Sequence, residues 1–106
     1  MSNVTTRVSG DGSQLTIEVN GRFDYSVHRE FRSAYIDAGL ANASYVIDLS
    51  RTEYMDSSAL GMVLLLREHV GGDKARVELR NARPEVEKIL RIANFDKLLT
   101  LRGALA

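Results

Sequence analysis

Runs with the apolar spacing of strands alternate with runs with the spacing of helices along most of this chain. The clearest strand covers residues 45–49, where apolar side chains follow one another almost without interruption. Such runs are typical of strands that are covered on both faces in a parallel sheet. A helix is predicted before this strand, over residues 27–38, and another after it, over residues 58–70. Strands separated by helices predict an α/β domain, because parallel neighbours need such crossovers.

The other predicted elements complete a mixed sheet. Four further strands are read from short alternating or apolar runs, over residues 4–8, 15–19, 76–80 and 98–101. The first two flank a glycine-containing turn and predict an antiparallel N-terminal hairpin. A third helix begins at Pro84, and residues 21–24 are predicted to be a turn. The order β-β-α-β-α-β-α-β therefore predicts one sheet with helices packed on it.

Length and composition limit what the chain can be. Its 106 residues suffice for one domain, residues 1–106, with a core over about residues 4–101. Fourteen basic and fourteen acidic side chains cancel, so no overall positive field favours nucleic acid or an anionic membrane. Cysteine is absent, which excludes disulfides and thiolate metal sites. No signal-peptide pattern and no apolar run of ~20 residues is present, so we expect a cytoplasmic protein that does not span a membrane.

The sequence offers little for catalysis. Neither Ser57 nor Ser58 lies in the Gly-x-Ser-x-Gly pattern of a hydrolase elbow. The two histidines, His28 and His69, fall on predicted helices, so no general base for a serine nucleophile is evident. Glycine-rich nucleotide-binding loops are absent as well. We therefore expect a protein without enzymatic activity and without a cofactor.

Three acids near strand ends raise the question of a metal site. Asp24, Asp48 and Asp56 would suit a Mg²⁺ cluster of the kind found in aspartyl-phosphate receiver domains. Such a receiver has paired acids after its first strand, whereas the turn at residues 21–24 offers one, and the chain opens with a hairpin. The residue pattern therefore favours no metal site.

The segment Asp56-Ser57-Ser58 stands where a strand and loop give way to a helix. A helix N-terminus attracts negative charge, because its first N–H groups are unpaired and its dipole is positive there. By spacing, Ser58 is predicted to cap the helix, and Ser57 to lie one residue outside it, available to a partner. On this pattern alone, a plain cap is favoured over a phosphate acceptor.

Residues 55–61, Met-Asp-Ser-Ser-Ala-Leu-Gly, together with the strand at 45–49 and the turn at 21–24, resemble the STAS domain of bacterial anti-sigma-factor antagonists. The order of segments matches from about residue 4 to residue 101. This resemblance implies a β-sheet backed by helices and a role as a protein-binding switch. In that family a serine kinase, which doubles as the anti-sigma factor, phosphorylates the first serine after the aspartate. A PP2C-type phosphatase removes the phosphate.

Carried over to this chain, the resemblance implies that Ser57 is the phosphoacceptor. It implies that the unphosphorylated protein binds the kinase/anti-sigma partner and that phosphorylation releases it. The expected partner-binding residues are Asp24, Asp56, Ser58 and Met62. Two positions depart from the family pattern: Ala59 replaces a common glycine, and Arg22 replaces a common glutamate. Arg22 reverses a charge near the expected docking surface, so the partner's identity cannot be copied from any one relative.

Two questions stay open at this point. The helix at 58–70 is apolar on more than one face, which favours deep burial, with an exposed docking patch around Met62 or Leu66 as the alternative. The chain could also be a STAS scaffold, or an accessory subunit of a transporter or signalling assembly, in which Ser57 is never modified. A monomer is expected for a lone domain of this size.

Overall fold

A computed structural model describes residues 3–39 and 43–103. Its strands are β1 (Val4–Val8), β2 (Gln14–Val19), β3 (Gly21–Phe23), β4 (Ser44–Asp48), β5 (Thr52–Met55), β6 (Val77–Ala82) and β7 (Thr100–Gly103). Its α-helices are α1 (His28–Ile36), α2 (Ser57–His69) and α3 (Pro84–Ile92). Three single 3-10 turns are η1 (Tyr25–Val27), η2 (Gly72–Lys74) and η3 (Phe95–Lys97). All eight predicted elements are present: β1 and the start of α3 are as predicted, and the ends of the other elements shift by at most two residues.

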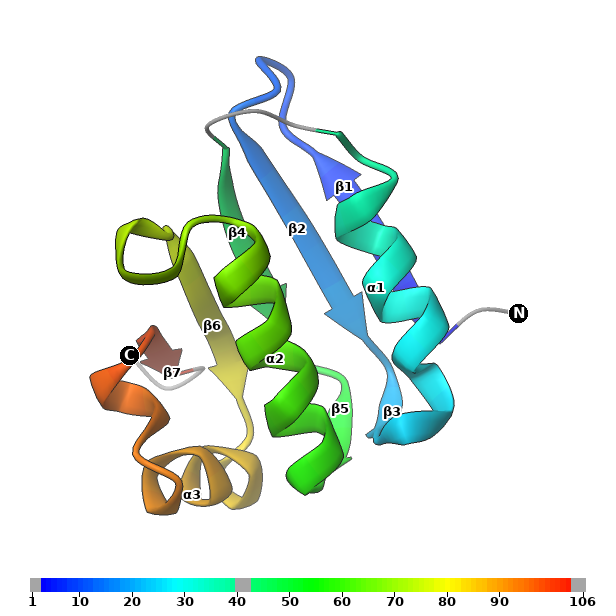
Figure 1. Cartoon of the computed structure of the whole chain (residues 1–106). Coiled ribbons are helices and arrows are strands. Elements are labelled where there is room, and N and C mark those ends of the chain that lie inside the picture. Colours follow the sequence, from blue (N-terminus) through cyan, green and yellow to red (C-terminus); the bar gives the residue numbers. More distant parts are fainter. Residues whose placement is uncertain (1–2, 40–42, 104–106) are drawn as a thin grey trace.

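Five of the strands form the main sheet, in the order β1-β2-β4-β6-β7. β1 runs antiparallel to β2, and every other neighbouring pair is parallel. The predicted mixed sheet with an N-terminal hairpin is therefore confirmed. In Figure 1, α1 and α2 lie across the same face of this sheet. Tyr45, Val46 and Ile47 of β4 are buried in succession, so that strand is covered on both faces, whereas β2 buries only the alternate residues that point to the face under the helices.

The core lies between that face and the helices. From the strands it receives Leu15, Ile17 and Ile47, each at most 1% exposed, and from α1 it receives Phe31. The ring of Phe31 lies 5.1 Å from that of Phe23, which carries the core to the end of the sheet where the parallel strands finish. This packing holds the segments at that end in place.

A second, two-stranded sheet was not predicted. β3 pairs in parallel with β5, in a region predicted to be a turn and a loop. The turn prediction for residues 21–24 is thus wrong for the first three of them. Gly21 has φ +78°, a conformation that a side chain would strain, and the register shifts directly after it. Strands this short are stabilised by long-range pairing, which periodicity along the chain does not reveal.

Thr52 anchors the small sheet to the large one. Its side chain is fully buried, and its hydroxyl donates a hydrogen bond of 2.7 Å to the carbonyl oxygen of Val19, the last residue of β2. The backbone N–H of Gly21 donates to the carbonyl oxygen of Arg51 at 2.9 Å beside it. One hydrogen bond therefore ties the start of β5 to the end of β2, and the other joins the first residue of β3 to the residue before β5.

The start of α2 differs from the prediction. Asp56 is the N-cap, because its Oδ1 accepts hydrogen bonds from the N–H groups of Ser58 (3.0 Å) and Ala59 (3.1 Å). Ser57 is the first helical residue rather than a loop residue outside the helix, and Ser58 is the second. A carboxylate caps as well as a hydroxyl and also neutralises part of the helix dipole.

Burial of α2 follows the favoured reading of its sequence. Met62 is 8% exposed and Leu66 is fully buried, so the suggested exposed patch around these two residues is wrong. The exposed apolar side chain of this helix is Leu65, with 64% of its surface accessible. α2 contacts α1 and β5, and it buries Ala59, Met62, Val63 and Leu66, while Leu60 and Leu64 are partly buried.

Replacing Thr52 with valine should lower the free energy of unfolding by about 1–3 kcal/mol, because the carbonyl of Val19 loses a buried donor while the side-chain volume stays the same. Urea denaturation followed by circular dichroism measures this change. Thr5→Val, at an exposed strand position, is the matched control and should change stability by less than about 0.5 kcal/mol. Equal effects of the two substitutions would contradict the anchoring role.

Asp56→Ala should lower the free energy of unfolding by about 1 kcal/mol at pH 7, whereas Asp56→Asn, which retains a capping oxygen, should keep most of it. Hydrogen bonding holds the pKa of Asp56 below its ordinary value. The charged cap therefore stabilises fully above about pH 4, and the difference between wild type and Asp56→Ala should shrink as the pH falls through the lowered pKa. Urea denaturation at several pH values tests this, and a pH-independent difference would rule it out.

Candidate functional site

Two helix-starting turns lie side by side at the end of the small sheet. Phe23 of β3 is in register with Met55 of β5, and both side chains are buried. Asp24 and Asp56 follow directly, so the parallel pairing brings the two acids to the same edge. Figure 1 shows β3 leading into α1 and β5 leading into α2 at this end of the molecule.

The two turns have the same construction. Asp24 and Asp56 are both extended, with φ −138° and −124°, and each carboxylate accepts from the serine two residues later. Oδ1 of Asp24 accepts the N–H and the hydroxyl of Ser26, and Oδ1 of Asp56 accepts those of Ser58. Of the Asp-x-Ser segments in the chain, these two, residues 24–26 and 56–58, each lead directly into a helical turn.

The two serines of the second turn have different surroundings. The Ser58 hydroxyl donates to Asp56 at 2.6 Å, and its side chain is half-buried. Ser57 is exposed, and its hydroxyl has no hydrogen-bond partner within the described ranges 3–39 and 43–103. A partner protein can therefore reach the oxygen of Ser57 without breaking the cap.

Hydrogen bonds and charge shape the electrostatics of the turns. The hydroxyl and N–H of Ser26 and the guanidinium of Arg22 hold the pKa of Asp24 below its ordinary value. The hydroxyl of Ser58 does the same for the pKa of Asp56, while the negative charge of Asp24 acts in the opposite direction. Both acids are thus carboxylates at neutral pH, and each lies within electrostatic reach of the other.

Exposed aromatic and basic side chains surround the acids. The guanidinium of Arg22 lies 4.4 Å from the ring centre of Tyr54, and its Nε donates to Oδ2 of Asp24 at 3.2 Å. The ring of Tyr25 stacks on that of His28 at 4.0 Å. Tyr25 and Tyr54 are 64% and 41% exposed, which is unusual for large aromatic side chains.

The structure thus brings four of the five predicted site residues together: Asp24, Asp56, Ser57 and Ser58. Met62 lies in the core behind them. Sequence reasoning missed Tyr25 and Tyr54 as neighbours of the site. The signal that could have found Tyr54 is the β3–β5 pairing, which places it beside Arg22.

The acids considered for Mg²⁺ are engaged in backbone turns. Oδ1 of Asp48 accepts the N–H of Ser50 at 2.9 Å, just as Asp24 and Asp56 accept from serines. Among the described residues, no three acidic or histidine side chains are grouped so that they could hold a metal ion.

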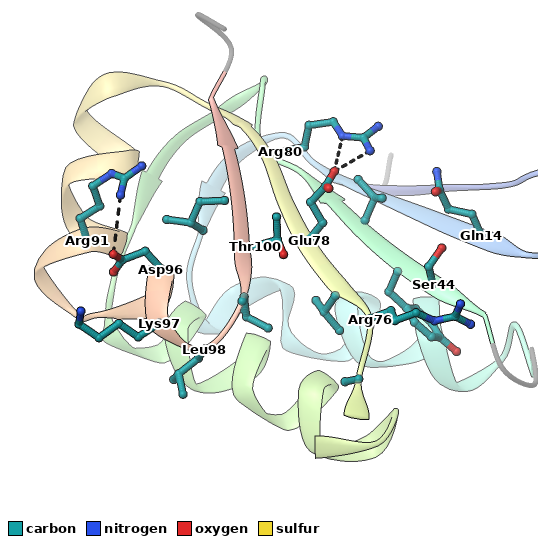
Figure 2. Close-up of a pocket in the computed structure, with 16 residues that line it drawn as sticks. Gln14, Ser44, Arg76, Glu78, Arg80, Arg91, Asp96, Lys97, Leu98 and Thr100 are labelled. Carbon is teal, nitrogen blue, oxygen red and sulfur yellow. Dashed lines mark hydrogen bonds and ion pairs between the residues drawn. The ribbon is translucent and has the colours of Figure 1, made fainter. Parts of the chain in front are cut away.

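A hollow of about 720 Å³ lies elsewhere, over β4, β6 and β7 (Figure 2). None of the predicted site residues lines it. Two of its arginines are paired, Arg80 with Glu78 at 2.6 Å and Arg91 with Asp96 at 3.8 Å. Four basic side chains line it against two acidic ones, so its own acids balance half of its positive charge. Separately, none of the described helices combines the length and apolarity that a membrane crossing requires.

Comparisons with solved structures agree on the fold. SpoIIAA, an anti-sigma factor antagonist, in its unphosphorylated form is 20% identical and superposes with a TM-score of 0.77, over 92% of this chain and 86% of that one. The Bacillus cell fate determinant SpoIIAA in its phosphorylated form gives 0.64 at 17% identity, over 92% and 89%. An anti-sigma factor antagonist from Mycobacterium paratuberculosis gives 0.72 at 20% identity, over 96% and 90%.

Sequence comparisons are more specific. The STAS-domain containing protein PA14_20770 of Pseudomonas aeruginosa (strain UCBPP-PA14) is 49% identical over 98 residues, which cover 92% of this chain and 97% of that protein. Residues 6–101 match the family described as "Mlab, STAS domain". On the strength of this match, which runs from within β1 to within β7 and includes all three α-helices, the chain belongs to the STAS domain family.

Proposed function

We propose that this protein is an anti-sigma-factor antagonist whose binding to a serine kinase/anti-sigma partner is switched off by phosphorylation of Ser57. A PP2C-type phosphatase restores the binding form. The protein itself is a monomeric, cytoplasmic regulator without enzymatic activity. The observation that carries the proposal is the difference between the two serines. The Ser58 hydroxyl donates a hydrogen bond to the capping Asp56, whereas the side chain of Ser57 is exposed.

The position of Ser57 suits a phosphate. As the first residue of α2, it lies at the positive end of a helix of 13 residues. A phosphate there gains about 0.3–1 kcal/mol from the helix dipole. Since Oδ1 of Asp56 already caps the helix, phosphorylation does not remove the cap. The domain therefore tolerates the modification.

A partner protein bound to the same surface does not tolerate phosphorylation of Ser57. Phosphorylation adds a charge of about −1.5 to −2 next to the carboxylates of Asp56 and Asp24. An interface formed around a neutral hydroxyl then has to desolvate or repel that charge, and each ~1.4 kcal/mol weakens binding tenfold. The fold survives while the complex dissociates, which is the behaviour of a switch.

The exposed side of α2 extends this surface. Beyond Ser57 come Gly61 at the next turn and Leu65, about 12 Å along the helix from Ser57. A Cβ atom built on Gly61 meets no other atom within 4 Å, so packing inside the domain does not require glycine there. A bare backbone beside an exposed leucine allows a partner to approach α2 closely. In this proposal Leu65, rather than Met62, is the apolar contact.

Protein purified from its own cells should include a form heavier by one phosphoryl group, located at Ser57 by fragmentation mass spectrometry. Ser57→Ala should abolish that form, and Ser58→Ala should retain it. For the kinase partner that copurifies with Ser57→Ala, Ser57→Asp should bind at least about tenfold more weakly, measured by calorimetry. No mass gain at Ser57 together with equal binding of both variants would instead favour an unmodified STAS scaffold or transporter subunit.

Gly61→Ala should raise the free energy of unfolding by about 0.5–1 kcal/mol, because alanine is the better helix former and its methyl group has free space. The same change should weaken binding of the kinase partner, since the methyl group stands on the docking surface. Gly10→Ala is the matched control: its Cβ also has free space, and it lies in the β1–β2 turn. Equal binding by Gly61→Ala and wild type would exclude close approach at this position.

A further inference from the structure

The side chains at the edge of the small sheet form an ordered set. In a strand, residues i and i+2 point to the same face, and the extended backbone of Asp24 and Asp56 continues that alternation. Arg22 and Asp24 from one strand therefore face the same side as Tyr54 and Asp56 from its neighbour, as the measured contacts of Arg22 with Asp24 and Tyr54 require. This face carries one cation, one ring and two carboxylates, directly beside Ser57.

The side chain of Arg22 is only weakly held at the edge of the small sheet. Its side chain is 67% exposed, so its ion pair with Asp24 contributes little net stability. The ring of Tyr54 keeps the guanidinium at the edge of the small sheet through a cation–π contact. Arg22 uses only Oδ2 of Asp24, whereas the turn uses Oδ1. Arg22 can therefore leave Asp24 without opening the turn that starts η1 and α1.

A phosphate on Ser57 would attract this cation. Asp24 and Asp56 already act on each other electrostatically, and the influences on Asp56 within the described chain include no cation of its own. A phosphate dianion binds a guanidinium more strongly than a single exposed carboxylate does, and the planar fork of arginine can contact two of its oxygens. The exposed carboxylate of Asp24 would then lose its partner.

We propose that Arg22 is the internal counter-charge for phospho-Ser57, and that phosphorylation moves its guanidinium from Asp24 to the phosphate. This inference rests on the proposed function in taking Ser57 as the modified residue. It adds a second change at the surface: phosphorylation also uncovers the Asp24 carboxylate and removes a positive side chain from the partner's reach. The switch therefore changes the charge pattern at two points.

The test uses full-length protein with phosphoserine installed at position 57 during translation, so that no kinase is needed. Phosphorus NMR then follows the second ionisation of the phosphate. In Arg22→Ala its pKa should rise by about half a unit relative to wild type, about a threefold change in proton affinity, because the dianion loses its cation. Arg22→Lys, which keeps the charge without the fork, should give a smaller rise.

Arg7→Ala is the control, since Arg7 is an exposed arginine on β1 and should leave the phosphate unchanged. In the protein with an intact Arg22, its Nε–H signal should also shift when phosphoserine replaces serine. An unchanged phosphate pKa in Arg22→Ala, with an unshifted Nε–H signal, would overturn the inference. If cells never phosphorylate Ser57 but the NMR shifts occur, the proposed function fails and this electrostatic coupling stands. If Ser57 is phosphorylated in cells but the shifts are absent, only the coupling fails.

Discussion

The pairing of β3 with β5 determines where every residue of the candidate site lies. Phe23 and Met55 bury the inner side of this pair in the core, and Thr52 ties it to the end of β2. The outer side is left exposed, with an acid at the end of each strand. Because the inner side of this pair is packed in the core, its seven residues hold the two helix starts at a fixed distance from each other. Without this pairing, Asp24 and Asp56 would belong to independent loops.

The electrostatic balance of the site follows from that placement. Two carboxylates are held close together, and each is stabilised by donors from its own turn. Arg22 neutralises one of them, and the N-terminus of α2 partly compensates the other. The site accommodates its own two negative charges, and in the proposed switch one further dianion changes which groups are paired. The proposed switching behaviour needs no change in the backbone.

Much of this architecture was predictable from the sequence. β2 shows a clear alternation of buried residues, and the runs that became β4 and α2 are strongly apolar over lengths typical of a strand and a helix. The mixed sheet and the hairpin followed from their order. The β3–β5 pair was not predictable, since three or four residues contain too little pattern and Gly21 reads as a turn.

The candidate site was only partly predictable from the sequence. The motif identified Asp56, Ser57 and Ser58 correctly as a helix start, but assigned the cap to the wrong residue, because Asp and Ser are both good caps. The exposure of Leu65 in place of Met62 depended on how α1 and β5 cover α2, which one helix alone does not reveal. The contact of Arg22 with Tyr54 depended on a strand pairing that was not expected.

The repeated Asp-x-Ser turn has a consequence for how such a domain can change. In both turns the aspartate carboxylate accepts from the N–H and the hydroxyl of the serine two residues later, and the side chain of the residue between them takes no part in these bonds. That middle residue is Tyr25 in one copy and Ser57 in the other. Under the proposed function, the phosphoacceptor is thus a property of one side chain, carried on a turn whose capping hydrogen bonds do not involve it. A single substitution at residue 57 then removes or restores regulation while the cap stays intact.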